Sequence, residues 1–160
     1  MFAPPHKTMN REWEEYAQAY PEKAKWMLST IEDIKMHPIC QAQFPEAVCD
    51  YVTAGFKLEA KRAGIKLRSQ GCKVGNTKHF ILYDPEADRF FDWTAHQFPS
   101  LEIKTNPEVI VATKAKLVSL GYHSFKSSKA AIKVLRRARI EYEEATSQNS
   151  SATDFQASKK

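Results

Sequence analysis

The spacing of apolar residues changes from a helical to a strand pattern at Gly64. Before this glycine, apolar residues recur every three or four positions, as on one face of a helix: Cys49, Val52, Phe56, Ala60 and Ala63. After it come three segments rich in β-branched and aromatic residues, which favour strands: 65–69, 78–83 and 89–93. Turn residues at 84–88 predict a hairpin between the last two. We therefore expect an α+β fold with a helix packed on a small antiparallel sheet.

Further helices are predicted on both sides of this core from apolar spacing and from proline, serine and glycine end signals. They cover 11–19, 21–36, 107–120 (opened by Pro107) and a last segment capped by Ser127 or Ser128 and running to 144. Residues 1–9 and 146–160 show no such period, and we expect a flexible tail at each end. A chain of 160 residues can bury one core, so residues 10–145 are predicted to form a single domain.

Composition excludes several classes of protein. No apolar stretch reaches the roughly 18–20 residues of a membrane span, and the first residues lack the apolar region of a secretory signal. Three cysteines are too few for a disulfide framework, and no paired spacing indicates a metal site. We expect no metal and no cofactor. The protein is predicted to be cytoplasmic where it is made, with delivery into a host or rival cell by a signal-independent secretion system left open.

A cysteine, a histidine and an aspartate follow one another on these predicted elements. Cys49 lies early in the helix that ends at Gly64, His79 on the second strand and Asp92 on the third. A helix N-terminus and a neighbouring imidazole both favour a thiolate, and a carboxylate on the far ring nitrogen orients the imidazole. The hairpin would bring positions 79 and 92 to the same end of paired strands. We therefore expect a nucleophilic cysteine site.

Two segments carry a resemblance to known enzymes. Cys49-Asp50-Tyr51-Val52 through Gly64, fifteen residues after the cysteine, resembles the nucleophile helix of transglutaminase-like enzymes and arylamine N-acetyltransferases. Asp92-Trp93-Thr94-Ala95-His96-Gln97-Phe98 is similar to the aspartate segment of bacterial papain-like toxin and effector domains. The resemblance covers about residues 43–98. It implies a papain-like core in which Cys49 is the nucleophile, His79 the general base and acid, and Asp92 the orienting group.

The same resemblance suggests an oxyanion donor, and it leaves rivals for each role. Gln43 stands six residues before Cys49, the offset of the oxyanion glutamine in papain-like proteases, although Gln41 is also close. Cys40 is a rival nucleophile and His96 a rival base, whereas Cys72 between two glycines looks incidental. One departure concerns Pro45. A proline favours the first turn of a helix, which predicts a helix that begins about a turn before Cys49.

A cysteine, histidine and aspartate together transfer an acyl group through a thioester to water or an amine. We therefore expect a deamidase, protease or transglutaminase acting on a protein substrate, with the resemblance favouring a toxin or effector. The alternative is a non-catalytic binding module. Between Leu101 and Arg139, nine Lys and Arg residues stand against Glu102 and Glu108, which suits an acidic protein partner and, less well, a nucleic acid.

Overall fold

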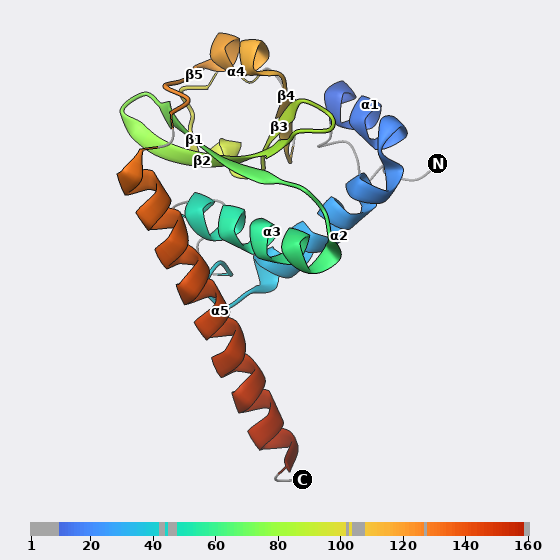
Figure 1. Cartoon of the computed structure of the whole chain (residues 1–160), viewed down its shortest axis with the longest axis vertical. Helices are drawn as coiled ribbons and strands as arrows, with labels where there is room; N and C mark the ends of the chain where they lie inside the picture. The colour runs from blue at the N-terminus through green and yellow to red at the C-terminus, as the bar shows by residue number, and fades with distance from the viewer. Residues whose placement is uncertain are drawn as a thin grey trace.

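The described residues form five α-helices and a five-stranded antiparallel sheet (Figure 1). The computed structural model describes residues 10–41, 44, 48–101, 103, 108–126 and 128–158, with side chains described as far as 147. The tail predicted over residues 1–9 lies outside these ranges. None of the described helices is long and apolar enough to cross a membrane. The expected α+β class is confirmed.

The strands are β1 (Arg68–Val74), β2 (Thr77–Asp84), β3 (Arg89–Asp92), β4 (Ile110–Ala112) and β5 (Tyr122–His123). They lie in the order β4-β3-β2-β1-β5 and form a curled sheet. The helices are α1 (Arg11–Ala19), α2 (Pro21–Met36), α3 (Cys49–Ala63), α4 (Lys114–Leu120) and α5 (Lys129–Ser158), with a 3-10 helix η1 at Ala95–Gln97. In Figure 1, α3 lies below the sheet and α4 above it.

The first two helices have the bounds predicted from the sequence. The Asn10 side chain caps α1 by accepting a hydrogen bond from the Trp13 backbone N–H at 3.0 Å. Pro21 occupies the first turn of α2, where its missing N–H costs nothing. Trp13 and Tyr16 are buried and meet the sheet through edge-on contacts, among them Tyr16 with Phe91 at 4.7 Å between ring centroids. These aromatic contacts fix α1 against β3.

The third helix begins at Cys49, later than the proline signal at Pro45 predicts. Val48 is its N-cap residue, with backbone angles outside the helical region, and residues 45–47 lie outside the described ranges. Gly64 ends the helix in the left-handed conformation with a φ of 71°, which glycine adopts without a steric cost. The predicted end is therefore confirmed, and the predicted start is wrong by about a turn.

The strands differ from the prediction in number and position. The first strand was expected over 65–69, but β1 covers Arg68–Val74 and includes Gly71. The chain turns at Gly75, whose φ is 60°. The hairpin between β2 and β3 is confirmed. A helix was expected over 107–120, and its first residue, Pro107, lies outside the described residues. Within residues 108–120, Ile110–Ala112 forms β4 and Lys114–Leu120 forms α4.

Alternate residues of the sheet enter two separate cores, as the strand period requires. Phe91 lies in the core that the sheet forms with α1, α2 and α3, together with Trp13 and Phe56. Its neighbour Phe90 lies in the other core, which the sheet forms with α4. The last helix, α5, crosses α3 and buries Ala138 and Tyr142 there. It extends past the predicted end at residue 144. The disorder predicted for 146–160 stays a prediction.

Candidate functional site

The imidazole of His79 and the carboxylate of Asp92 form a buried pair. His79 Nε2 lies 2.7 Å from Asp92 Oδ2, and the two side chains are 0% and 1% exposed. The antiparallel pairing of β2 with β3, in which Leu82 faces Phe91, brings the two residues together. The hydrogen bond that we expected across the hairpin is therefore present.

Three further donors hold the carboxylate. The Tyr122 hydroxyl donates to Oδ2 at 2.5 Å, and on Oδ1 the Thr94 backbone N–H and hydroxyl donate at 2.9 and 3.2 Å. Burial acts to raise the pKa of Asp92, but the His79 charge and these hydrogen bonds outweigh it and hold that pKa below its usual value. Asp92 is thus an ionised acceptor with four bonds.

The same pair determines the charge state of His79. Burial alone lowers the pKa of an imidazole, but the Asp92 carboxylate and its hydrogen bond raise the pKa of His79 to about 10. Because a carboxylate only accepts, Nε2 is assigned as the donor to Asp92. Nδ1 is completely buried and has no hydrogen-bond partner among the described residues. It is the ring atom left to exchange a proton.

The thiol of Cys49 stands at the N-terminus of α3 and close to this imidazole. Cys49 is the first residue of the helix and is half-buried. It is near enough to add to the raised pKa of His79, although no hydrogen bond of ordinary geometry joins the two residues. A thiolate at this position gains from the positive end of the helix dipole. The two groups are therefore neighbours that are not aligned in this conformation.

The rival residues have less suitable surroundings. Cys40 is buried, and burial together with Asp50 raises the pKa of its thiol to about 12. Cys72 pairs with His79 across β1 and β2, and burial, Asp92 and Cys49 raise the pKa of its thiol. His96 lies exposed on η1, and the imidazole that binds Asp92 is that of His79. Of the three thiols, only Cys49 is not fully buried.

The oxyanion prediction lies outside what the structure describes. Gln43 is not among the described residues, and its rival Gln41 is exposed. The Cys49 backbone N–H, the second donor that an oxyanion site of this kind uses, is at the start of α3. The position of the glutamine thus stays a prediction.

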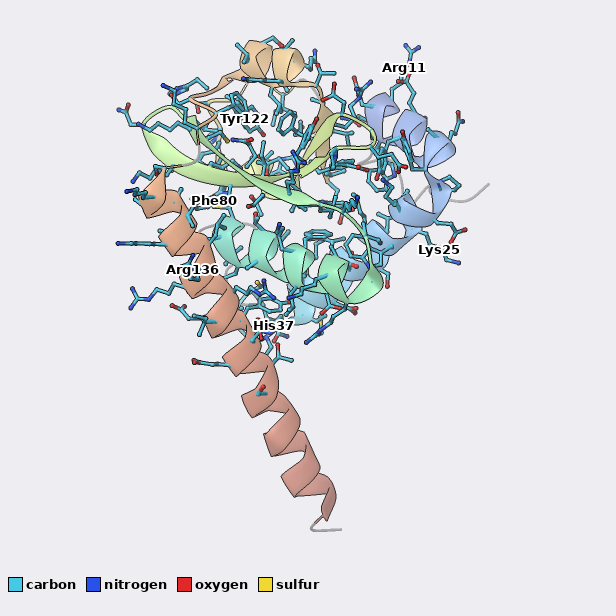
Figure 2. The ribbon with its side chains drawn as sticks, in the orientation of Figure 1. Arg11, Lys25, His37, Phe80, Tyr122 and Arg136 are labelled. Carbon is cyan, nitrogen blue, oxygen red and sulfur yellow. The ribbon has the colours of Figure 1, made fainter. Side chains whose placement is uncertain are left out.

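Tyr122, Thr94 and Phe98 complete the site, and the sequence reasoning assigned none of them a role in it. The Phe98 ring meets His79 edge-on, with the centroids 4.7 Å apart, and Gln97 Nε2 donates to Thr94 Oγ1 at 3.0 Å. Thr94, Gln97 and Phe98 follow Asp92 closely, so proximity in the sequence could have indicated them. Tyr122 lies thirty residues away on β5, under α4 (Figure 2). No local pattern distinguishes it from the other tyrosines.

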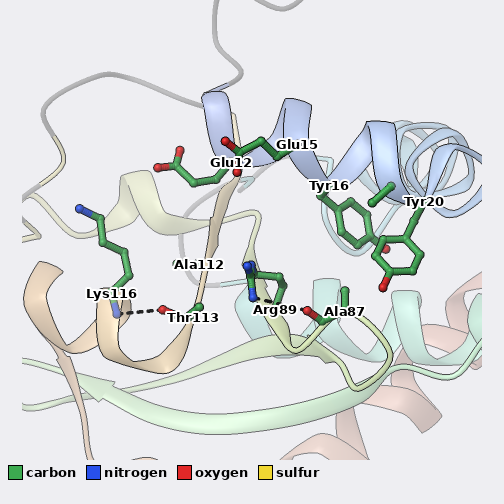
Figure 3. Close-up of a pocket in the computed structure, with 10 residues that line it drawn as sticks. Glu12, Glu15, Tyr16, Tyr20, Ala87, Arg89, Ala112, Thr113 and Lys116 are labelled. Carbon is green, nitrogen blue, oxygen red and sulfur yellow. Dashed lines mark hydrogen bonds between the residues drawn. The ribbon is translucent and has the colours of Figure 1, made fainter.

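Other groups of polar residues lie away from Cys49, His79 and Asp92. One of them surrounds a cavity of about 230 Å³. In Figure 3, Glu12 and Glu15 of α1 stand across this cavity from Arg89 and Lys116. Its described lining includes none of Cys49, His79 and Asp92. Within the described part of the chain, no three His, Cys, Asp or Glu residues are grouped as metal ligands.

Comparison of the chain with protein-family models, curated proteins and solved structures finds no significant match.

Proposed function

We propose that this chain is a cysteine-nucleophile acyl-transfer enzyme of the papain-like and transglutaminase-like kind, with Cys49 as nucleophile, His79 as general base and acid, and Asp92 as the orienting group. One observation carries the proposal. A buried imidazole is bound by a carboxylate through one ring nitrogen, lies near a thiol at a helix N-terminus, and has no hydrogen-bond partner for its other nitrogen in the described part of the chain. The class of reaction is deamidation or proteolysis of a protein substrate, or transamidation.

The chemistry follows from the charge state of the pair. Since the pKa of His79 is raised to about 10, the imidazole stays protonated at neutral pH and supports an adjacent thiolate at Cys49. The sulfur attacks the carbonyl carbon of an amide, and His79 Nδ1 gives its proton to the nitrogen that leaves as ammonia or an amine. Water, or a second amine, then gives a proton to His79 and breaks the thioester.

Formation of this contact needs a small movement, because the thiol and Nδ1 are not aligned. Catalytic hydrogen bonds are often long or badly angled before a substrate binds. Cys49 is the N1 residue of α3, where its side chain is less constrained by a preceding helical turn. A change of its side-chain rotamer is the movement that we expect to bring sulfur and nitrogen together.

Thiol reactivity tests the proposal directly. In the full chain at near-neutral pH, iodoacetamide should modify Cys49 faster than Cys40 and Cys72, measured for each cysteine by peptide mass spectrometry. His79→Ala should slow Cys49 at least about tenfold, because the thiolate loses its counter-ion. His123→Ala, at an exposed histidine, is the matched control and should leave the rate unchanged. Equal and slow labelling of all three thiols would contradict the proposal.

A second variant distinguishes a folding defect in His79→Ala from loss of the imidazolium beside the Cys49 thiolate. His79→Gln keeps a polar side chain at this position, and circular dichroism shows whether either variant is folded. The folded variant must still label slowly at Cys49. Intact-mass analysis of candidate protein substrates then distinguishes the reactions, since deamidation adds about one dalton, proteolysis yields fragments and transamidation yields an adduct.

A second candidate function is a non-catalytic binding module that uses α5. Ile132 and Ile140 are 48% and 52% exposed on this helix, and the exposed Lys133 and Arg136 lie on it too. Figure 2 shows Arg136 pointing away from the rest of the molecule. A mixed apolar and basic surface suits an acidic protein partner. The labelling experiment separates the two functions, because a binding module has no need of a reactive Cys49.

A further inference from the structure

The molecule has a second hollow of unusual charge at the C-terminal end of α3. A cavity of about 380 Å³ lies between the end of α3, the start of β1, the turn after β2 and α5. Its volume falls within the range of roughly 300–1,000 Å³ that is typical of small-molecule sites. The described residues that line it include five cationic side chains: Lys57, Lys61, Lys66, Arg68 and Arg139. None of the described residues that line this cavity is acidic.

The charges in this cavity are largely uncompensated. Among the ion pairs of the described residues, only Arg139 of the five has a carboxylate partner, the exposed Glu143 at 3.1 Å. Lys57 is half-buried, and its Nζ donates to the Leu67 carbonyl oxygen at 3.2 Å. Burial, and then the charges of Arg139 and Arg68, lower the pKa of Lys57. Like charges that repel one another in a partly desolvated hollow are stabilised by an anion.

The floor of the cavity has a different character from its rim. Ala60 and Leu67 are buried there, and Ile65 and Pro85 are half-buried. Apolar walls with a few converging polar groups are the usual composition of a small-molecule site. Two of the cations are arginines, whose planar guanidinium groups bind phosphate through two parallel hydrogen bonds. The chemistry therefore favours clustered phosphate groups over a single carboxylate.

We propose that this cavity binds a compact ligand that carries several phosphate groups, with Lys57, Lys61, Lys66, Arg68 and Arg139 as its cationic contacts. The site is separate from the cysteine site. Lys57 and Lys61 follow Cys49 by eight and twelve residues, which corresponds to about 12 and 18 Å along a helix. The binding function does not depend on the chemistry proposed for Cys49.

Calorimetric titration of the full chain with inorganic tripolyphosphate tests this proposal. Binding should be measurable at low salt and should weaken as sodium chloride is added, because the contacts are ionic. Lys61→Glu combined with Arg68→Glu, both at exposed positions, should weaken binding at least about tenfold. Arg11→Glu combined with Lys25→Glu makes the same change in net charge at exposed positions of α1 and α2, outside the cavity. This control should alter the dissociation constant less than about threefold, which corresponds to a difference near 0.6 kcal/mol.

Further titrations identify the kind of molecule that supplies the phosphates and show whether binding depends on the cysteine site. Adenosine triphosphate and vesicles containing a phosphoinositide, each titrated in the same way, show whether a free nucleotide or a lipid headgroup is preferred. Cys49→Ala should bind tripolyphosphate as well as the wild type does. Absence of binding by the wild type, or an equal loss in both charge-reversal pairs, would overturn the proposal, whatever the labelling of Cys49 shows.

Discussion

The Tyr122 hydroxyl donates a hydrogen bond to the carboxylate oxygen of Asp92 that also binds His79. The Tyr122 oxygen lies 2.5 Å from Asp92 Oδ2, and His79 Nε2 lies 2.7 Å from the same atom. Burial and the nearby carboxylate raise the pKa of the Tyr122 phenol, so the hydroxyl keeps its proton and remains a donor. A residue of the last strand therefore holds the group that orients His79.

Removal of this phenol should be costly. In Tyr122→Phe the buried carboxylate loses a donor, and a hydrogen bond to a charged group contributes about 1.5–3 kcal/mol. We expect the free energy of unfolding in urea to fall by that amount. The matched control is Tyr83→Phe, which removes the bond from Tyr83 to the exposed Asp88 and should change stability by less than about 0.5 kcal/mol. Equal effects of the two substitutions would show that Tyr122 does not support Asp92.

The buried pair should make stability depend on pH in a specific direction. His79 has a pKa raised from 6.5 to about 10, so its contribution is complete below pH 6.5 and is lost as the pH rises through about 10. Asp92 has a lowered pKa, so its contribution is present above its ordinary pKa of 3.8 and is lost on acidification. Urea unfolding should therefore show stability from this pair declining above pH 6.5, by at most about 1.4 kcal/mol per pH unit.

Two carboxylate variants separate this pair from the other titrating groups. Asp92→Asn removes the charge that raises the pKa of His79, so the decline above pH 6.5 should be much reduced and the imidazole should titrate at lower pH by NMR. Asp84→Asn alters another buried carboxylate, which binds Lys23 and Tyr16. It should lower stability but keep the decline. An unchanged His79 titration in Asp92→Asn would contradict the assignment.

The contact of α3 with α5 depends on the absence of a side chain at Gly55. A Cβ atom there would lie 3.0 Å from the Tyr142 ring and 3.1 Å from Ile34. The Tyr142 ring cannot move away freely, because the His37 ring is stacked on it with the two ring centroids 3.7 Å apart. Gly55→Ala should gain up to about 1 kcal/mol of helix propensity but lose about 1–3 kcal/mol to overpacking. We expect net destabilisation in urea unfolding.

A double-mutant cycle checks the cause of that loss. In a Tyr142→Ala background the obstructing ring is gone and the 3.1 Å approach to Ile34 remains, so adding Gly55→Ala should cost clearly less than it does in the wild type. If Gly55→Ala costs the same in both backgrounds, the close approach to Tyr142 is not the reason that glycine is required.

Local signals explain the parts of the fold that the sequence predicts. Asn10, Pro21 and Gly64 mark helix ends through their own backbone and side-chain properties, and the turn at 84–88 joins strands that are adjacent in the chain. These features need no distant partner. The hydrogen bond between His79 and Asp92 follows from the same hairpin, which is why it could be expected from spacing alone.

The missed features depend on distant segments. β5 has two residues and exists because Val74 and Lys73 pair with Tyr122 and His123, which no local pattern reveals. The apolar run at Val109–Ala112 is too short to separate a buried strand from a helix by its period. The start of α3 at Cys49, rather than a turn earlier, also could not be derived from Pro45. The position of the thiol relative to the helix N-terminus was thus not predictable.

The late position of Tyr122 in the chain has a consequence for biosynthesis. His79 and Asp92 are thirteen residues apart, whereas the phenol that supports their bond is made thirty residues after Asp92. A nascent chain that has emerged only as far as β4 carries Cys49, His79 and Asp92. It does not yet carry Tyr122, whose hydroxyl donates a hydrogen bond to the Asp92 carboxylate. Completion of the site therefore coincides with emergence of the C-terminal part of the sheet from the ribosome.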